Sequence, residues 1–209
     1  MRKKVLLGCF AVLTAVSLAG CSSDNGKKVE SKKKVEKATD KSAETDDSKT
    51  GEIVEENGMK KVPVMTDKKL NMTGKTGPIK YSIDGIQISK FTATTDEMAD
   101  TLEIDKNKEI TLVALNVSAE NTSDKTVNFY LGQAKIATDT KEQADPDVML
   151  GENLEGEFLG KVKHNGTNIY LLKNSKADKI NKIKLFVDAP SDENYESVGN
   201  KVELELKLK

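Results

Sequence analysis

The residues best suited to chemistry lie near the N-terminus, where the sequence LAGC at residues 18–21 closes an apolar run that begins at Val5. A cationic start, MRKK, precedes this run, and the run is too short to span a bilayer comfortably. The small residues before the cysteine allow an extended backbone to enter a narrow peptidase cleft. The thiol of Cys21 is the only group there that is nucleophilic enough to accept a lipid.

This motif resembles the bacterial lipobox, whose cysteine receives a diacylglyceryl thioether before the leader is removed. The resemblance implies a lipoprotein signal peptide at residues 1–20, acyl chains such as palmitate on Cys21, and a location on the outer face of the cytoplasmic membrane of a Gram-positive bacterium. Two acyl chains give lasting attachment, whereas one chain gives only reversible binding. The alternative is an ordinary secretory signal in which Cys21 is incidental.

The cysteine content agrees with this interpretation. The chain has two cysteines, of which Cys9 lies inside the apolar run and Cys21 would be consumed by the lipid. The processed protein would therefore have no free thiol. This excludes a disulfide scaffold, a thiolate metal site and a catalytic cysteine for the mature domain.

The single histidine, His164, stands beside Asn165-Gly166. Asn-Gly accepts positive φ at low cost and predicts a two-residue hairpin turn. A catalytic imidazole must be held by packing, so we predict that His164 is an exposed turn residue with no catalytic role. One histidine without a free cysteine also disfavours a zinc site.

Four acidic residues gather around Pro146. These are Asp139, Glu142, Asp145 and Asp147. Their spacing fits no standard calcium loop, so we expect a solvated acidic loop and no metal site. Paired carboxylates could serve glycoside hydrolysis, but the chain has no tryptophan on which to stack a sugar.

The segment Gly74-Lys75-Thr76-Gly77 contains the Gly-Lys-Thr of phosphate-binding loops without the earlier glycine that such loops need. We expect it to be a hinge, with Gly77-Pro78 marking the start of the first strand. The sequence therefore predicts no cofactor site.

The chain divides by composition after the leader. Residues 21–61, which include the lipidated cysteine, have no aromatic residue and many lysines and acids, and they predict a disordered linker. Residues 62–209 have the usual size of one domain. The whole chain has a net charge of −1, and basic residues are not concentrated in residues 62–209. Both observations argue against nucleic acid as a partner.

Strand patterns dominate the predicted domain. Apolar residues alternate from Ile79 to Ile88, with a phase shift at Asp84-Gly85 that predicts a bulge. The run from Ile110 to Ala119 is apolar on both faces and predicts a central strand, which should form a hairpin with Thr126–Leu131. Further strands are expected at residues 134–138, 158–163, 167–172, 183–187 and 202–208. A capping box of Thr94 and Glu97 predicts one short helix.

Eight aromatic residues remain after the leader, and most of them fall in these strand patterns, where they are expected to form the core. They are Tyr81, Phe91, Phe129, Tyr130, Phe158, Tyr170, Phe186 and Tyr195.

The sequence ITLVALNVSAENTSDKTVNFY at residues 110–130, and GEFLGKVKHNGTNIYLL at residues 156–172, resemble the immunoglobulin-like extracellular domain of many Gram-positive lipoproteins. Those domains are similar to the fold of a secreted mycobacterial immunoprotective antigen. The resemblance implies an all-β, immunoglobulin-like antiparallel β-sandwich. Its motifs, including Asn121-Thr122-Ser123, are structural and imply no ligand.

These observations predict a non-enzymatic binding or structural module of the cell envelope, which would contact an envelope protein through loops and strand edges. One alternative is an envelope hydrolase that uses scattered carboxylates. Another is a solute-delivering lipoprotein of a transporter, which is weakened because one domain offers no second lobe to close over a solute.

Overall fold

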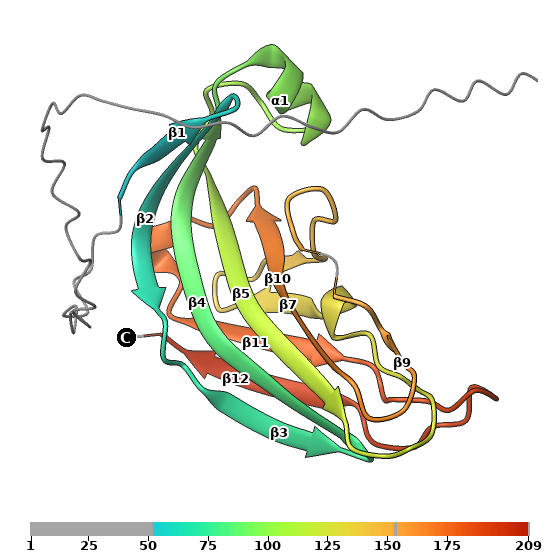
Figure 1. The fold of residues 1–209 in the computed structure, drawn as a ribbon. Helices are drawn as coiled ribbons and strands as arrows, with labels where there is room; N and C mark the ends of the chain where they lie inside the picture. Colours follow the sequence, from blue (N-terminus) through green and yellow to red (C-terminus); the bar gives the residue numbers. More distant parts are fainter. Residues whose placement is uncertain (1–51, 153, 209) are drawn as a thin grey trace, which may run out of the picture. The chain divides into compact units, whose positions relative to one another are not determined.

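The computed structural model describes residues 52–152 and 154–208, which form an antiparallel β-sandwich (Figure 1). The large sheet has the strand order β1-β2-β4-β5-β10, and β3 also pairs with β4. Its strands are β1 (Val54–Glu56), β2 (Met59–Asp67), β3 (Met72–Thr76), β4 (Ile79–Ala93), β5 (Ile110–Asn121) and β10 (Lys163–Leu172). The predicted all-β sandwich is thus confirmed.

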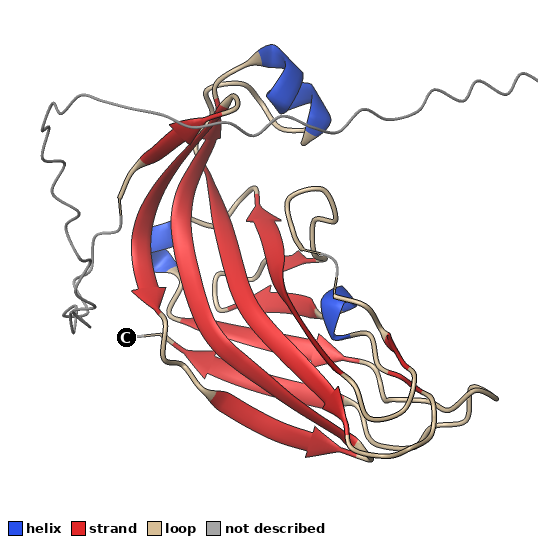
Figure 2. Cartoon of the chain, viewed as in Figure 1, coloured by secondary structure: helices blue, strands red, loops and turns tan. Residues whose placement is uncertain are grey.

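The small sheet has the strand order β12-β11-β7-β8. Its strands are β7 (Lys135–Thr138), β8 (Gln143–Ala144), β11 (Lys182–Val187) and β12 (Val202–Lys207). A separate short ladder joins β6 (Val127–Asn128) to β9 (Glu157–Phe158). In residues 52–152 and 154–208, helical structure is limited to α1 (Asp96–Thr101) and two 3-10 turns, at Leu131–Gln133 and Ala177–Lys179 (Figure 2). No helix among the described residues is long and apolar enough to cross a membrane.

The main core lies between the sheets and follows the period of two in each strand. Val113, Leu115 and Val117 of β5 are buried toward the small sheet, whose Ile183 and Leu185 face them in the same apolar cluster. The intervening residues of β5 reach the opposite face of the large sheet. There a second cluster is covered by α1 and the turn that follows it. Its buried members are Phe91, Leu102, Ile110 and Leu112.

The predicted bulge in the first long strand is confirmed. The pairing of β4 with β5 shifts register between Ile83 and Gly85. This shift keeps Ile83 and Ile86 on the same buried face although they are three residues apart. The strand can therefore continue through the bulge to Ala93 and contribute to both apolar clusters.

Two boundaries differ from the sequence prediction. The linker was expected to continue to Lys61, but β1 and β2 already pair from Val54 onward, so that part of the predicted boundary is wrong. The helix is capped by Thr95 instead of Thr94, because the Thr95 hydroxyl accepts a hydrogen bond from the N–H of Met98 at 3.3 Å.

The predicted hairpin of β5 with Thr126–Leu131 is also wrong. The neighbour of β5 on that side is β10, which pairs with it from Lys163 to Leu172. The short strand β6 bonds instead to β9 and to Ser191, whose N–H and carbonyl both join Asn128, at 2.9 and 2.8 Å. The turn itself forms as expected, since the buried Asn121 side chain accepts from Ser123 and donates to the Lys125 carbonyl.

The free edge of β10 is covered by residues 147–152. The N–H of Asp147 donates to the Ile169 carbonyl at 2.7 Å, and the N–H of Glu152 donates to the Thr167 carbonyl at 3.0 Å. Gly151 lies between these bonds, where an added Cβ would be 3.0 Å from the Thr167 carbonyl oxygen. Glycine therefore allows the loop to approach the strand closely, whereas a larger residue would press on this oxygen and on the Asp147 carbonyl oxygen at 3.1 Å.

Ser89 provides a test of the packing on the second face. Its side chain is fully buried, and its hydroxyl has no hydrogen-bond partner among the described residues. A buried hydroxyl without a partner carries a desolvation cost, so Ser89→Ala is expected to raise the free energy of unfolding by about 1 kcal/mol. Urea unfolding followed by circular dichroism would measure this. The exposed serine variant Ser197→Ala serves as a control, and a loss of stability in Ser89→Ala would contradict the assignment.

Candidate functional site

The candidate site lies on the outer face of the small sheet. Residues of β11 alternate, so that Ile183, Leu185 and Val187 are buried whereas Phe186 points outward. Lys135 of β7 is paired with Phe186 in the register of the sheet and faces the same way. The outer face of a sheet that covers the core on its other side is thus available for contact.

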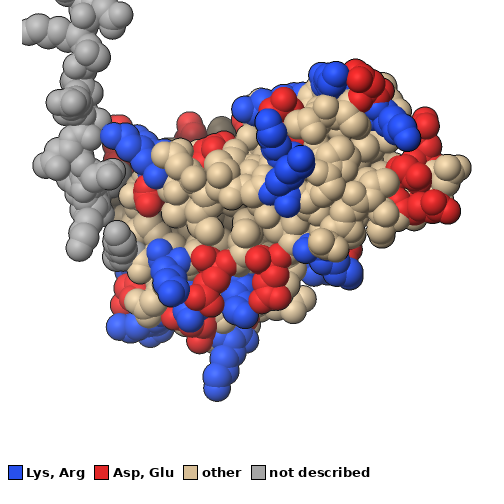
Figure 3. All heavy atoms as spheres, turned by 90° about the horizontal axis from the view of Figure 1, so that it is seen from below, with Lys and Arg blue, Asp and Glu red and all other residues tan. Residues whose placement is uncertain are grey.

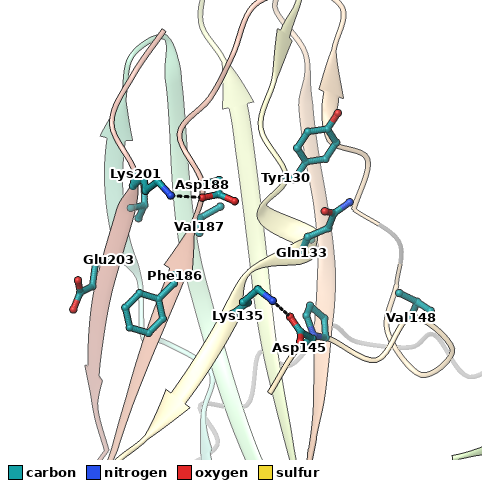
Figure 4. A pocket seen from close by; sticks show the side chains of 13 residues that line it. Tyr130, Gln133, Lys135, Asp145, Val148, Phe186, Val187, Asp188, Lys201 and Glu203 are labelled. Atoms are coloured by element: carbon teal, nitrogen blue, oxygen red, sulfur yellow. Dashed lines mark hydrogen bonds and ion pairs between the residues drawn. The ribbon is translucent and has the colours of Figure 1, made fainter. Parts of the chain in front are cut away.

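A groove of about 570 Å³ runs along this face and under the loop from Asp145 to Val148 (Figure 4). Tyr130 is 46% exposed, Phe186 is 37% exposed and Val148 is 91% exposed. In Figure 4 the ion pair of Lys135 with Asp145 lies between Phe186 and Val148. Large apolar side chains that remain exposed together in a concave surface mark an interaction site more often than isolated ones do.

Tyr130 is positioned by the backbone that faces it. It precedes the 3-10 turn at Leu131–Gln133, and its ring packs directly against Gly156, where any Cβ would collide with the ring. The N–H of Phe129 donates to the Gly156 carbonyl at 2.7 Å and fixes the separation of the two segments. The exposed edge of the tyrosine is therefore held in place by the main chain beneath it.

Ion pairs form the rim of the groove. The ammonium of Lys135 lies 2.6 Å from a carboxylate oxygen of Asp145, and that of Lys201 lies 2.9 Å from Asp188. The hydrogen bond from Lys201 holds the pKa of the Asp188 carboxyl below its usual range, and the pKa of Lys201 is raised in return. These groups are solvent-exposed, so their pairing contributes more to the shape and charge of the rim than to stability.

The arrangement suits binding better than bond cleavage. Aromatic and aliphatic surface supplies contact area, and paired charges around it supply orientation. A general acid at neutral pH needs a raised carboxyl pKa, and the shift at Asp188 has the opposite sign.

His164 lies inside β10 and is half-buried, so the prediction that it is an exposed turn residue is wrong. Its ring stacks on Phe158 with centroids 4.5 Å apart, and Nδ1 lies 2.9 Å from the Glu155 carbonyl oxygen. Asn165 and Gly166 pair with Ser118 and Val117 as ordinary strand residues. The glycine instead allows close approach of the loop around Glu152, whose carbonyl oxygen an added Cβ would meet at 3.2 Å.

The four acidic residues around Pro146 are not brought together. Asp139 accepts from the N–H of Asn181 at 3.2 Å, and Glu142 accepts from the N–H of Ser175 at 2.7 Å. Asp145 pairs with Lys135, whereas Asp147 accepts from the backbone of its own turn. Within residues 52–152 and 154–208, no group of three His, Cys, Asp or Glu side chains could hold a metal ion.

The segment Gly74-Lys75-Thr76-Gly77 is part of a hairpin and not a hinge. Thr76 ends β3 and pairs with Ile79, and Gly77 adopts a φ of +53° in the two-residue turn between them. The Thr76 hydroxyl donates to the Asn200 carbonyl at 2.7 Å and accepts from the Asn200 N–H at 2.8 Å. This hairpin thus joins the large sheet to the segment before β12.

The lipidation site predicted at Cys21 and most of the predicted linker lie outside the described residues.

The groove on the small sheet was not predicted from the sequence, because its aromatic residues were assigned to the core. For Phe186 the signal was present: the residue is out of phase with the apolar positions on either side of it. Nothing local in the sequence marks Tyr130, whose exposure depends on the loop that contains Gly156.

Comparison with known proteins connects the chain to lipoproteins. No family model matches the sequence. The chain is 29% identical over 163 residues to the SPbeta prophage-derived uncharacterized lipoprotein YonS of Bacillus subtilis, covering 77% of this chain and 72% of that protein. A functionally unknown protein from Listeria monocytogenes EGD-e has a similar fold, with a TM-score of 0.53 and 9% identity over 71% of this chain and 88% of that one. The sequence similarity supports a membrane-anchored envelope lipoprotein of a Gram-positive bacterium.

Proposed function

We propose that a diacylglyceryl thioether on Cys21 holds this protein on the outer face of the cytoplasmic membrane, where its β-sandwich acts as a non-enzymatic binding module. The sequence LAGC after a cationic and apolar leader supports the anchor, together with the similarity to a Bacillus lipoprotein. The proposal includes the immunoglobulin-like class and its likeness to the mycobacterial antigen. Two antiparallel sheets packed around one apolar core support that class.

The groove on the small sheet carries the binding proposal. Tyr130, Phe186 and Val148 expose apolar surface there instead of contributing it to the core. Keeping three such side chains in water costs stability that burial would have provided, which favours a role in contact with another molecule. An envelope protein that offers apolar side chains flanked by charges of both signs would complement the groove and its rim.

Two alternative functions, an envelope hydrolase and a solute-delivering lipoprotein of a transporter, have less support. In a hydrolase, one carboxyl should be kept protonated by its surroundings, but Asp145 and Asp188 each pair closely with a lysine. Delivery of a solute usually requires two lobes that close over it, and the described residues form one sandwich. On the face drawn in Figure 3, basic and acidic side chains both lie around a largely uncharged band, so this face offers no extended basic surface for nucleic acid.

Crosslinking on intact cells tests the binding role. A partner captured by a photoreactive residue at Gln133 should be lost in Val148→Asp, because a charge would enter the apolar lining at a side chain that is 91% exposed and unimportant for folding. We expect at least a fivefold loss of the crosslinked species, corresponding to about 1 kcal/mol. Its recovery would be measured by quantitative mass spectrometry.

The matched control is Tyr195→Asn, which removes an aromatic residue that is 84% exposed and lies outside the groove. This variant should leave the crosslinked species unchanged. Equal capture by Val148→Asp and the unmodified protein would remove the groove from consideration. Turnover of a wall polymer by the purified protein would instead overturn the non-enzymatic assignment.

A further inference from the structure

A row of charged side chains crosses four strands of the large sheet. In the register of the sheet, Lys75 of β3 lies directly opposite Lys80 of β4. Glu120 of β5 lies opposite both Lys80 and Lys163 of β10. All four side chains are exposed, and they alternate with residues buried in the main core, so they lie together on the outer face. Three ammonium groups and one carboxylate give this row a formal charge of +2.

One contact in this row is unfavourable. Two lysines directly opposite each other on one face of an antiparallel pair repel, and such pairs are destabilising. On the small sheet Lys182 likewise lies opposite Lys207, but there both ammonium groups have a carboxylate partner in Glu205, at 3.4 and 3.9 Å. In the part of the chain that the structure describes, Lys75, Lys80 and Lys163 form no ion pair with a carboxylate.

Hydroxyl groups form the next row of the same face. Thr73 pairs with Ser82, and Ser82 pairs with Ser118 in the register of the sheet. The Ser82 and Ser118 oxygens are 2.7 Å apart, so one hydroxyl donates to the other. Each hydroxyl has a single proton, which leaves one proton of this pair free to donate to an external acceptor.

These two rows surround a hollow of about 480 Å³. Thr73, the two serines, the three lysines and Glu120 line it, whereas the ring of Tyr81 packs against the main core on the other face of the sheet. The hollow is on the large sheet, whereas the groove of Tyr130 and Phe186 is on the small sheet. The hollow is therefore a separate feature, with a charged and hydrogen-bonding lining instead of an aromatic one.

We propose that this hollow binds a phosphate group. Lysine ammonium groups and hydroxyl protons are the donors that a phosphate accepts, and its negative charge would offset the repulsion between Lys75 and Lys80. Glu120 reduces the positive charge of the row, so that one singly or doubly charged anion can balance it. The phosphate can belong to a lipid headgroup of the membrane or to a free phosphorylated solute, since the chemistry of recognition is the same.

Thermal unfolding of the full chain in detergent tests the site. Inorganic phosphate, compared with chloride at equal ionic strength, is expected to raise the melting temperature of the unmodified protein. Lys80→Gln should remove this shift and weaken phosphate binding about tenfold in calorimetry, because it removes the central ammonium of the row. The same variant should be about as stable as the unmodified protein in chloride, because it loses both the repulsion from Lys75 and the attraction of Glu120.

A variant that loses the phosphate shift but keeps its stability in chloride has lost the site and not the fold. Lys201→Gln is the control: it makes the same change of charge at an exposed lysine just before β12, outside the hollow, and should keep the phosphate shift. A phosphate shift that is absent from the unmodified protein, or is equal in Lys80→Gln and Lys201→Gln, would overturn the proposal.

Vesicles distinguish the two sources of phosphate. The mature chain from residue 21, with Cys21→Ser to remove the lipid, would be sedimented with phosphatidylglycerol–phosphatidylcholine vesicles. Weaker sedimentation of Lys80→Gln than of Lys201→Gln identifies a lipid headgroup as the source. Equal sedimentation of the two variants, together with a phosphate shift that depends on Lys80, identifies a free phosphorylated solute.

Discussion

Replacing Tyr170 with alanine is expected to lower the free energy of unfolding by about 3–5 kcal/mol. The ring is fully buried in β10, between the large sheet and the segment that leads into β7. Its hydroxyl donates to the Ala134 carbonyl at 2.8 Å and accepts from Nδ2 of Asn168 at 3.2 Å. Since domains are stable by only about 5–15 kcal/mol, equilibrium urea unfolding should show a large shift of the midpoint.

Two further variants separate the contribution of the buried ring from that of its hydroxyl and provide a control. Tyr170→Phe keeps the ring but leaves the Ala134 carbonyl without its donor, and it should cost about 1–3 kcal/mol. Tyr195→Asn removes a tyrosine that is 84% exposed at a φ of +62°, a conformation that asparagine tolerates, and should cost nothing measurable. A similar midpoint for Tyr170→Ala and Tyr195→Asn would refute the role of the buried phenol.

The protonation of this phenol gives the same interaction a pH dependence. Burial raises the pKa of Tyr170 above its ordinary value, so the folded protein holds the proton to higher pH than the unfolded chain does. Stability from this group is complete below the unfolded-state tyrosine pKa of about 10 and is lost as the pH rises above it.

Replacing Cys21 with alanine is expected to abolish lipid attachment, because the other thiol of the chain, Cys9, lies inside the apolar run and not after the Leu-Ala-Gly that marks the acceptor. Palmitate labelling of cells should no longer mark the protein, and the chain should either keep its leader or leave the membrane fraction. Two acyl chains provide an affinity that the remaining protein cannot replace, so we expect loss of nearly all label. Intact mass spectrometry would show whether residues 1–20 have been removed.

The second cysteine supplies the control for this experiment. Cys9→Ala changes a thiol inside the apolar run without altering residues 18–21, so labelling and processing should persist. Labelling that persists in Cys21→Ala, or an unmodified sulfur at position 21 in native protein, would rule out the proposed anchor.

Local patterns predicted the strands well because alternation reports directly on burial. The bulge of β4 at Asp84-Gly85 and the central place of β5 in its sheet follow from which residues must face the core. Strands β7, β11 and β12 lie where alternating apolar residues predicted them. These features depend on the period of the backbone, which each segment carries by itself.

Pairing between distant segments could not be predicted in the same way. The partner of Asn128 is Ser191, which lies far along the sequence, and no local signal selects it over the nearer β5. Asn165-Gly166 has the composition of a turn, but its glycine serves the approach of the loop around Glu152. The phosphate hollow depends on register across β3, β4, β5 and β10, so its lysines are scattered in the sequence.

The loop at residues 147–152, which covers the edge of β10, matters for a protein that is held at a membrane surface. Its bonds to the Ile169 and Thr167 carbonyls occupy acceptors that could otherwise template a foreign strand. Molecules restricted to two dimensions meet far more often than they would in bulk water, and bare sheet borders then polymerise readily. Covering this border removes one place at which neighbouring copies could add strand to strand.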